Sequence, residues 1–143
     1  MMAMLLCLAT SCATDMQKYK ETRISIEITS QTGTHTFTAK LVDNSSAEAF
    51  IAALQKAPVT VQMHDYGDFE KVGSLGFSLP RNDSRITTEP GDMILYQGNQ
   101  ITIYYDTNTW NFTRLGKIEG ITPSELRSIL GKSDVKAVFS IIE

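Results

Sequence analysis

The sequence predicts a mainly β domain with two short helices. The chain has 143 residues, 42% of them apolar, which suffices for one packed core and is too short for two domains. Apolar and polar residues alternate in several segments, as is typical of half-buried strands. Two other segments place apolar residues at helical spacing behind capping residues.

The first predicted elements are a β-hairpin and a helix. Isoleucines alternate with polar residues over 24–28, and apolar residues alternate again over 37–41, with a turn at Gly33 between them. Ser45 and Glu48 are spaced as a capping box, and apolar residues then recur at helical spacing over 47–54. We expect a helix of about three turns there.

Strands dominate the middle of the chain. Residues 59–63 alternate as a third strand, and residues 66–76, rich in Gly and acidic residues, are expected to form a loop. Pro90-Gly91 indicates a turn before MILY, and Gly98-Asn99 is expected to join MILY to ITIYY as a second hairpin.

The last predicted elements are a helix and a strand. Thr122 is the expected N-cap, with Pro123 at the first helical position and Glu125 at the third. Gly131 is expected to end this helix. Apolar residues then alternate over 135–141, which predicts a final strand.

Three motifs, in this order, carry a resemblance to a known fold. LVDNSSAEAFIAAL resembles the strand-to-helix junction of cyclophilins, GDMILY followed by ITIYY resembles two of their central barrel strands, and LGKIEGITPSELRSIL resembles the approach to their second helix. The region 23–143 is most similar to the compact bacterial cyclophilin-like family, in which GD-x-x-x-Y and TRLG-[KR]-I recur. The resemblance implies a closed β-barrel capped by the two helices.

The resemblance does not extend to the catalytic pattern of prolyl isomerases. Those enzymes use an Arg that weakens amide resonance beside an apolar pocket, and the matching region, 62–80, contains no Arg. They place a His four residues before the Gly that Gly116 matches, where this chain has Phe112. Trp110 lies six residues before Gly116, whereas the enzymes' ligand-binding Trp lies nine before. No catalytic residue is therefore predicted.

Aromatic residues supply the candidates for a binding site. Most are expected to pack in the core or barrel wall, because strands favour aromatic side chains. An apolar pocket in the barrel mouth, with Arg114 as a polar anchor, is nevertheless expected, and Tyr66, Trp110 and Arg114 are the predicted ligand-binding residues. The aromatic residues that could line such a pocket are Tyr66, Phe69, Phe77, Tyr96, Tyr104, Tyr105, Trp110 and Phe112.

The N-terminus resembles a lipoprotein leader. MMAMLLCLATSC is apolar and then small, and LATSC resembles the lipobox in which a cysteine, here Cys12, is acylated. This predicts a leader over 1–12, a tether over 13–22 and a domain over 23–143, anchored by lipid in the cell envelope. The alternative is a cytoplasmic protein with an apolar N-terminus.

Composition excludes several kinds of chemistry. Thirteen basic and 16 acidic side chains without a basic run argue against a nucleic-acid partner. Both cysteines, Cys7 and Cys12, precede the predicted domain, which therefore has no thiol chemistry. The donors His64, Asp65, Asp68 and Glu70 are close enough in sequence to suggest a metal site, but a solvated acidic turn is the favoured interpretation. No metal or cofactor is predicted.

The functional expectation is a non-catalytic binding module. Its partner would be a peptide, a small apolar ligand or an envelope protein. A divergent prolyl isomerase is the first alternative. The second follows from relatives joined to flavodoxin-like domains, which imply a partner domain of a redox protein.

Overall fold

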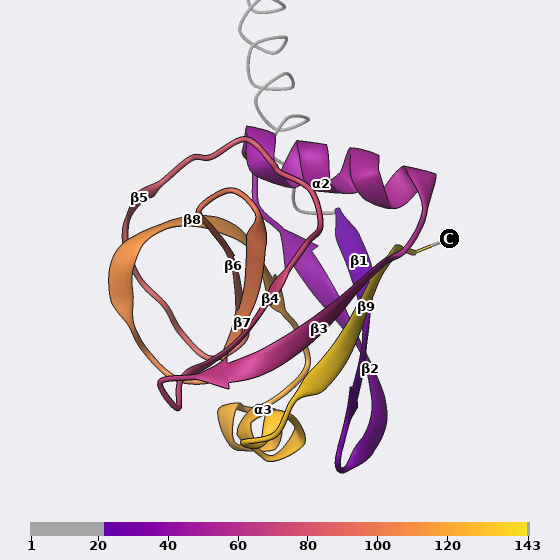
Figure 1. Ribbon diagram of the computed structural model, residues 1–143, viewed down its shortest axis with the longest axis vertical. Helices are drawn as coiled ribbons and strands as arrows, with labels where there is room; N and C mark the ends of the chain where they lie inside the picture. The colour runs from indigo at the N-terminus through magenta and orange to yellow at the C-terminus, as the bar shows by residue number, and fades with distance from the viewer. Residues whose placement is uncertain (1–21, 143) are drawn as a thin grey trace, which may run out of the picture.

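The computed structural model describes residues 22–142, and these form the mainly β domain that the sequence predicts (Figure 1). Nine strands and two helices follow one another along this part of the chain. In order they are β1 (Arg23–Ser30), β2 (Gly33–Leu41), α2 (Ser45–Lys56), β3 (Val59–Tyr66), β4 (Glu70–Ser74), β5 (Ser84–Thr87), β6 (Asp92–Tyr96), β7 (Gln100–Tyr104), β8 (Thr109–Ile118), α3 (Pro123–Leu130) and β9 (Val135–Ile141).

Eight of these strands close into an antiparallel barrel. Their order is β2-β1-β9-β3-β4-β7-β6-β8, and β8 pairs back onto β2, while β5 lies outside the ring and pairs with the first half of β8. The closing register joins Leu41 to Gly116. A Cβ atom at Gly116 would lie 2.4 Å from the carbonyl oxygen of Lys40, so the seam needs a residue without a side chain. The closed barrel expected from the sequence is confirmed.

The core fills the barrel, and the helices cover its ends. Ile24, Ile26 and Ile28 of β1 are fully buried, as their alternation predicts. Helices α2 and α3 lie at opposite ends of the barrel (Figure 1). Phe50 of α2 packs edge-on against Phe139 of β9, with ring centroids 5.7 Å apart.

The N-cap of α3 is the predicted residue, whereas the N-cap of α2 is not. The expectation for α3 is confirmed, because the Thr122 side chain accepts a hydrogen bond from the Glu125 amide. The capping box expected at Ser45 is wrong. The N-cap of α2 is Asn44, whose Oδ1 accepts from the Ala47 amide at 2.8 Å, and whose Nδ2 donates to the carbonyl of Arg114 on β8. This second bond fixes Asn44 just outside the helix, and Ser45 becomes the first helical residue.

The loop expected over 66–76 is wrong, because it contains strand β4. This strand lacks the alternating apolar pattern. Its inward positions hold Lys71 and Gly73, and a Cβ at Gly73 would lie 2.3 Å from the Gln62 carbonyl oxygen of β3. Lys71 is buried because it pairs with Asp65 on β3, a partner that periodicity cannot reveal.

The predicted leader over 1–12, with Cys12, and most of the predicted tether over 13–22 lie outside the described residues. Within 22–142, neither helix has the length and apolar character needed to cross a bilayer.

Candidate functional site

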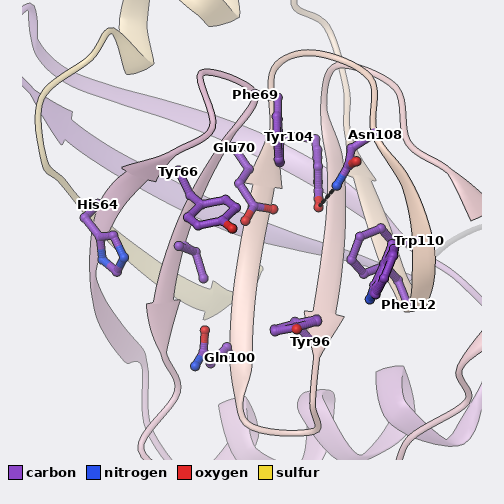
Figure 2. A pocket seen from close by; sticks show the side chains of 11 residues that line it. His64, Tyr66, Phe69, Glu70, Tyr96, Gln100, Tyr104, Asn108, Trp110 and Phe112 are labelled. Carbon is purple, nitrogen blue, oxygen red and sulfur yellow. Dashed lines mark hydrogen bonds between the residues drawn. The ribbon is translucent and has the colours of Figure 1, made fainter.

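A cavity of about 550 Å³ lies on the outer wall of the barrel (Figure 2). Strand alternation fixes this placement: in β7, Ile101 and Ile103 belong to the inner core, whereas Gln100 and Tyr104 line the cavity. The pocket expected in the barrel mouth is therefore on the outer wall instead. Six aromatic side chains line this outer-wall cavity, namely Tyr66, Phe69, Tyr96, Tyr104, Trp110 and Phe112. Its other lining residues are His64, Glu70, Val72, Gln100 and Asn108.

Strand register brings distant residues together in this cavity. Tyr66 of β3 pairs with Glu70 of β4, which pairs with Tyr104 of β7, so these three form one row across the sheet. Phe112 reaches the same face from β8, where it packs with Tyr104 and the buried Ile94. Side chains from five strands thus build one site, which explains why it could not be read from any single segment.

The rings form a continuous aromatic surface. Tyr66 meets Phe69 edge-on at 5.8 Å, and Phe69 stacks on Tyr104 at 5.9 Å with 3° between the ring planes. Phe112 lies 5.8 Å from Tyr104 and 6.2 Å from Tyr96, between ring centroids. These separations are typical of favourable aromatic pairs, so the cavity floor is packed in the free protein.

Two exposed aromatic side chains stand at the rim. Tyr66 is 61% exposed and Trp110 is 56% exposed, whereas Tyr104 and Phe112 of the floor are buried. Among the described residues only Ile142 is a further large hydrophobic side chain with comparable exposure. Two of the three predicted ligand-binding residues, Tyr66 on β3 and Trp110 on β8, therefore line this cavity from opposite sides and contribute exposed apolar surface to it (Figure 2).

Arg114, the third predicted ligand-binding residue, does not line the cavity. Its Nη1 donates to Oδ2 of Asp92 at 2.9 Å, and Asp92 is fully buried. The same carboxylate oxygen accepts from the amide of Glu89. A buried carboxylate needs a cationic partner, which explains why Arg114 turns to Asp92 instead of serving as an anchor for the cavity.

Glu70 is the acidic group of the cavity, and it is 8% exposed. The Tyr104 hydroxyl interacts with its carboxylate, and this hydroxyl accepts a hydrogen bond from Asn108 Nδ2 at 3.4 Å. Burial raises the pKa of Glu70, the Tyr104 bond opposes this rise, and the charge of Asp65 adds to it. Burial and the bond to Glu70 raise the pKa of Tyr104, so its hydroxyl remains a proton donor.

The remaining polar donors near Glu70 have other roles. Asp65 points inward, where it accepts hydrogen bonds from Tyr105 and from Lys71 at 3.2 Å. His64 faces the outer-wall cavity instead. Within 22–142 no three His, Cys, Asp or Glu side chains are grouped so as to hold a metal ion.

The cavity lining is mainly aromatic, and its polar members are Glu70, His64, Gln100 and Asn108 apart from the tyrosine hydroxyls. None of its lining residues within the described part of the chain is Arg or Lys. It therefore lacks the amide-polarising group that the resemblance implies for those enzymes. The lining provides an apolar aromatic surface together with the carboxyl of Glu70, the side-chain amides of Gln100 and Asn108, and the imidazole of His64.

A second groove, over β1, β2 and β9, is less suited to a specific ligand. Phe37 is its single aromatic side chain among the described residues. Its charged residue, Glu119, is already paired with Arg23 at 2.7 Å.

Sequence reasoning missed Glu70 as a cavity residue and considered it only as a metal donor. Glu70 and Lys71 stand together between Phe69 and Val72, so no apolar alternation in the sequence points to a cavity residue there. Of the aromatic set, Tyr105 points to the core and Phe77 lies outside the lining.

Comparisons with known proteins agree with the architecture. The sequence model of a family described as "Cyclophilin-like family" matches residues 30–141. Among solved structures, the solution structure of a hypothetical protein from Archaeoglobus fulgidus is similar, with a TM-score of 0.59 and 15% identity over 86% of this chain and 96% of that chain. At this identity the likeness concerns the fold alone. No curated protein matches the sequence.

Proposed function

The chain belongs to the cyclophilin-like family, and from that premise we propose that it is a non-catalytic binding module whose ligand occupies the outer-wall cavity. One observation carries the proposal: Tyr66 and Trp110 expose their rings to solvent beside a packed aromatic floor. Soluble proteins seldom leave such surface uncovered unless it binds something. The volume of about 550 Å³ lies in the range of small-molecule sites.

The absence of catalysis is part of the proposal. Transition-state stabilisation requires a group that acts on the amide as it twists, and no Arg of the described chain lines the cavity. Ground-state contacts to the rings do not depend on such a group. Binding without turnover is therefore the expected behaviour.

We also propose that Cys12 anchors the protein in the cell envelope. The support for this is the leader sequence itself, which is apolar, then small, and ends in cysteine. A lipid anchor would hold the binding module close to ligands of the envelope.

A neutral apolar dye, Nile red, tests whether the cavity binds. Truncating an exposed aromatic anchor should weaken dye binding to the full chain by at least about fivefold, as removal of hot-spot residues does. The variant is Trp110→Ala, and the matched control is Ile142→Ala, which removes an exposed apolar side chain outside the cavity. Equal dye affinity for the wild type and Trp110→Ala would contradict the proposal.

A proline-peptide assay tests the alternative function. The uncatalysed barrier of about 18–20 kcal/mol makes the background slow and easy to measure. We expect no acceleration by the full chain. Turnover that Arg114→Ala abolishes would favour a divergent isomerase, because Arg114 would then have to leave Asp92 during the reaction.

A further inference from the structure

The chemistry of the ligand follows from the charge inside the outer-wall cavity. Glu70 is a nearly buried carboxyl surrounded by rings, and it forms no ion pair with any described residue. Its partner is the neutral hydroxyl of Tyr104. Burying a carboxylate without a counter-charge costs free energy, so the free protein holds an unbalanced group at this position.

Nearby cations are directed away from Glu70. Lys71, the next residue of β4, points into the barrel and pairs with Asp65. Arg114 of β8 pairs with Asp92. The cavity therefore combines aromatic faces, one carboxyl and no Lys or Arg among its described lining residues.

Aromatic rings and a carboxylate together favour a cation. The face of an aromatic ring carries negative electrostatic potential, and several rings around one site attract ammonium groups more strongly when water is excluded. An anionic ligand would be repelled by Glu70, and a neutral ligand would leave the carboxylate without a partner.

We propose that the ligand of this cavity is a small organic cation whose ammonium group sits against Glu70 and the surrounding rings. This inference rests on the proposed function, since it names the chemical class that the same cavity takes. The ammonium group lies beside Glu70 and Tyr104, and the apolar body of the ligand lies against the rings that line the cavity. The ligand supplies the counter-charge that the protein lacks.

Binding of a cation should depend on pH through Glu70. The pKa of the free carboxyl is raised by burial, and a bound cation lowers it by favouring the charged form. The affinity for the cation is therefore highest above the pKa of Glu70 in the ligand-free protein, and it falls as the pH drops through that pKa. The other titratable groups that line the cavity with Glu70 are His64 and Tyr66 from β3, Tyr96 from β6 and Tyr104 from β7. Asp65 of β3 points inward, and only its charge acts on Glu70.

The test compares two probes of the same shape, choline and its neutral carbon isostere 3,3-dimethylbutan-1-ol. Binding to the full chain is followed by Trp110 fluorescence and by calorimetry. We expect choline to bind at least about tenfold more tightly than the alcohol, because only choline adds cation–π contacts and a Coulomb attraction to the carboxylate. Glu70→Gln should remove most of this preference and the pH dependence, while the alcohol binds both proteins within about twofold.

Matched variants separate Glu70 from its neighbours. Asp68→Asn removes a nearby exposed charge that does not line the cavity, so it should keep the preference. His64→Gln removes the imidazole, so a pH dependence that survives this change belongs to Glu70. Circular dichroism and urea unfolding of each variant show whether it is folded.

The outcomes distinguish the ligand class from the site itself. Equal affinity for choline and the alcohol, or a preference unchanged in Glu70→Gln, would overturn the cation inference and leave the cavity as a neutral apolar site. No detectable binding at about 10 mM choline, a concentration far above ordinary dissociation constants, would also overturn the cation inference. If Nile red also fails to bind, the proposed function falls as well.

Discussion

The buried ion pair between Lys71 and Asp65 predicts that substitutions of its two members have unequal costs. Lys71 is fully buried, and its Nζ lies 3.2 Å from Asp65 Oδ1 and 2.7 Å from the carbonyl oxygen of Ser133. The Asp65 side chain is 19% exposed and also accepts a hydrogen bond from Tyr105. Asp65 thus keeps water and a donor if Lys71 is removed. Lys71 without the Asp65 carboxylate would keep the Ser133 carbonyl and the Tyr105 ring, whose centroid lies 6.0 Å from Nζ, but no counter-charge among the described residues.

The magnitudes follow from this asymmetry. Asp65→Asn leaves an ammonium group buried without its counter-charge, so it should lower the free energy of unfolding by about 3–5 kcal/mol. Lys71→Met removes the charge and preserves most of the volume of the stem. The variant loses the bonds to Asp65 and Ser133 but leaves no buried charge without a partner. Its free energy of unfolding should therefore fall by less than about 2 kcal/mol.

Urea unfolding followed by circular dichroism measures both losses. Lys117→Met is the control, because it breaks an exposed ion pair with Glu89 and should change stability little. If Lys71→Met costs more than Asp65→Asn, or if Asp65→Asn is within about 0.5 kcal/mol of the wild type, the assignment of a buried ion pair is wrong.

The same pair sets a pH dependence of stability. Burial alone would raise the pKa of Asp65, but hydrogen bonds from Tyr105 and Lys71 outweigh burial and lower it. A carboxyl whose folded pKa is below its unfolded pKa adds stability above the unfolded value, about 3.9, and loses it as the pH falls through the folded value. Asp65→Asn should flatten this acid limb of the stability curve.

Three further predictions concern the barrel and its anchor. Gly116→Ala should cost about 1–3 kcal/mol or more, because its Cβ would collide with the Lys40 carbonyl oxygen, and thermal unfolding measures the loss; an unchanged midpoint would contradict the tight seam. Phe50→Ala should cost about 3–5 kcal/mol in urea unfolding, since the ring is fully buried against Phe139; a loss near zero would mean that α2 does not close the barrel. Cys12→Ser should move the protein from the membrane fraction to the soluble fraction; equal partition of the wild type and Cys12→Ser would contradict the proposed lipid anchor.

The fold was predictable where local pattern and tertiary packing agree. The alternating isoleucines of β1 and the Thr122 cap of α3 lie as expected, because each needs only neighbours in sequence. Strand β4 was not predictable, since Lys71 is buried through a partner on another strand. Asn44 replaced Ser45 as the cap of α2 because β8 supplies its second hydrogen bond.

The candidate site was predictable only in part, because contacts between distant segments decide which side chains reach it. Tyr66 and Trp110 were predicted as ligand-binding residues, and both line the cavity. Arg114 was expected beside them, but the buried Asp92 holds it. Glu70 enters the site through pairing of β3, β4 and β7, a register that no local motif encodes.

We propose above all that ligands bind on the outer wall of the barrel. A backbone amide NMR titration with choline and with 3,3-dimethylbutan-1-ol tests it most directly, because it locates the bound probe. We predict shift changes concentrated in residues 64–72, 96–104 and 108–112, which carry the lining side chains, and larger changes with choline than with the alcohol. Changes concentrated instead at the second groove, near Thr36–Thr38 and Ser140–Ile142, would contradict the claim, as would no change with either probe.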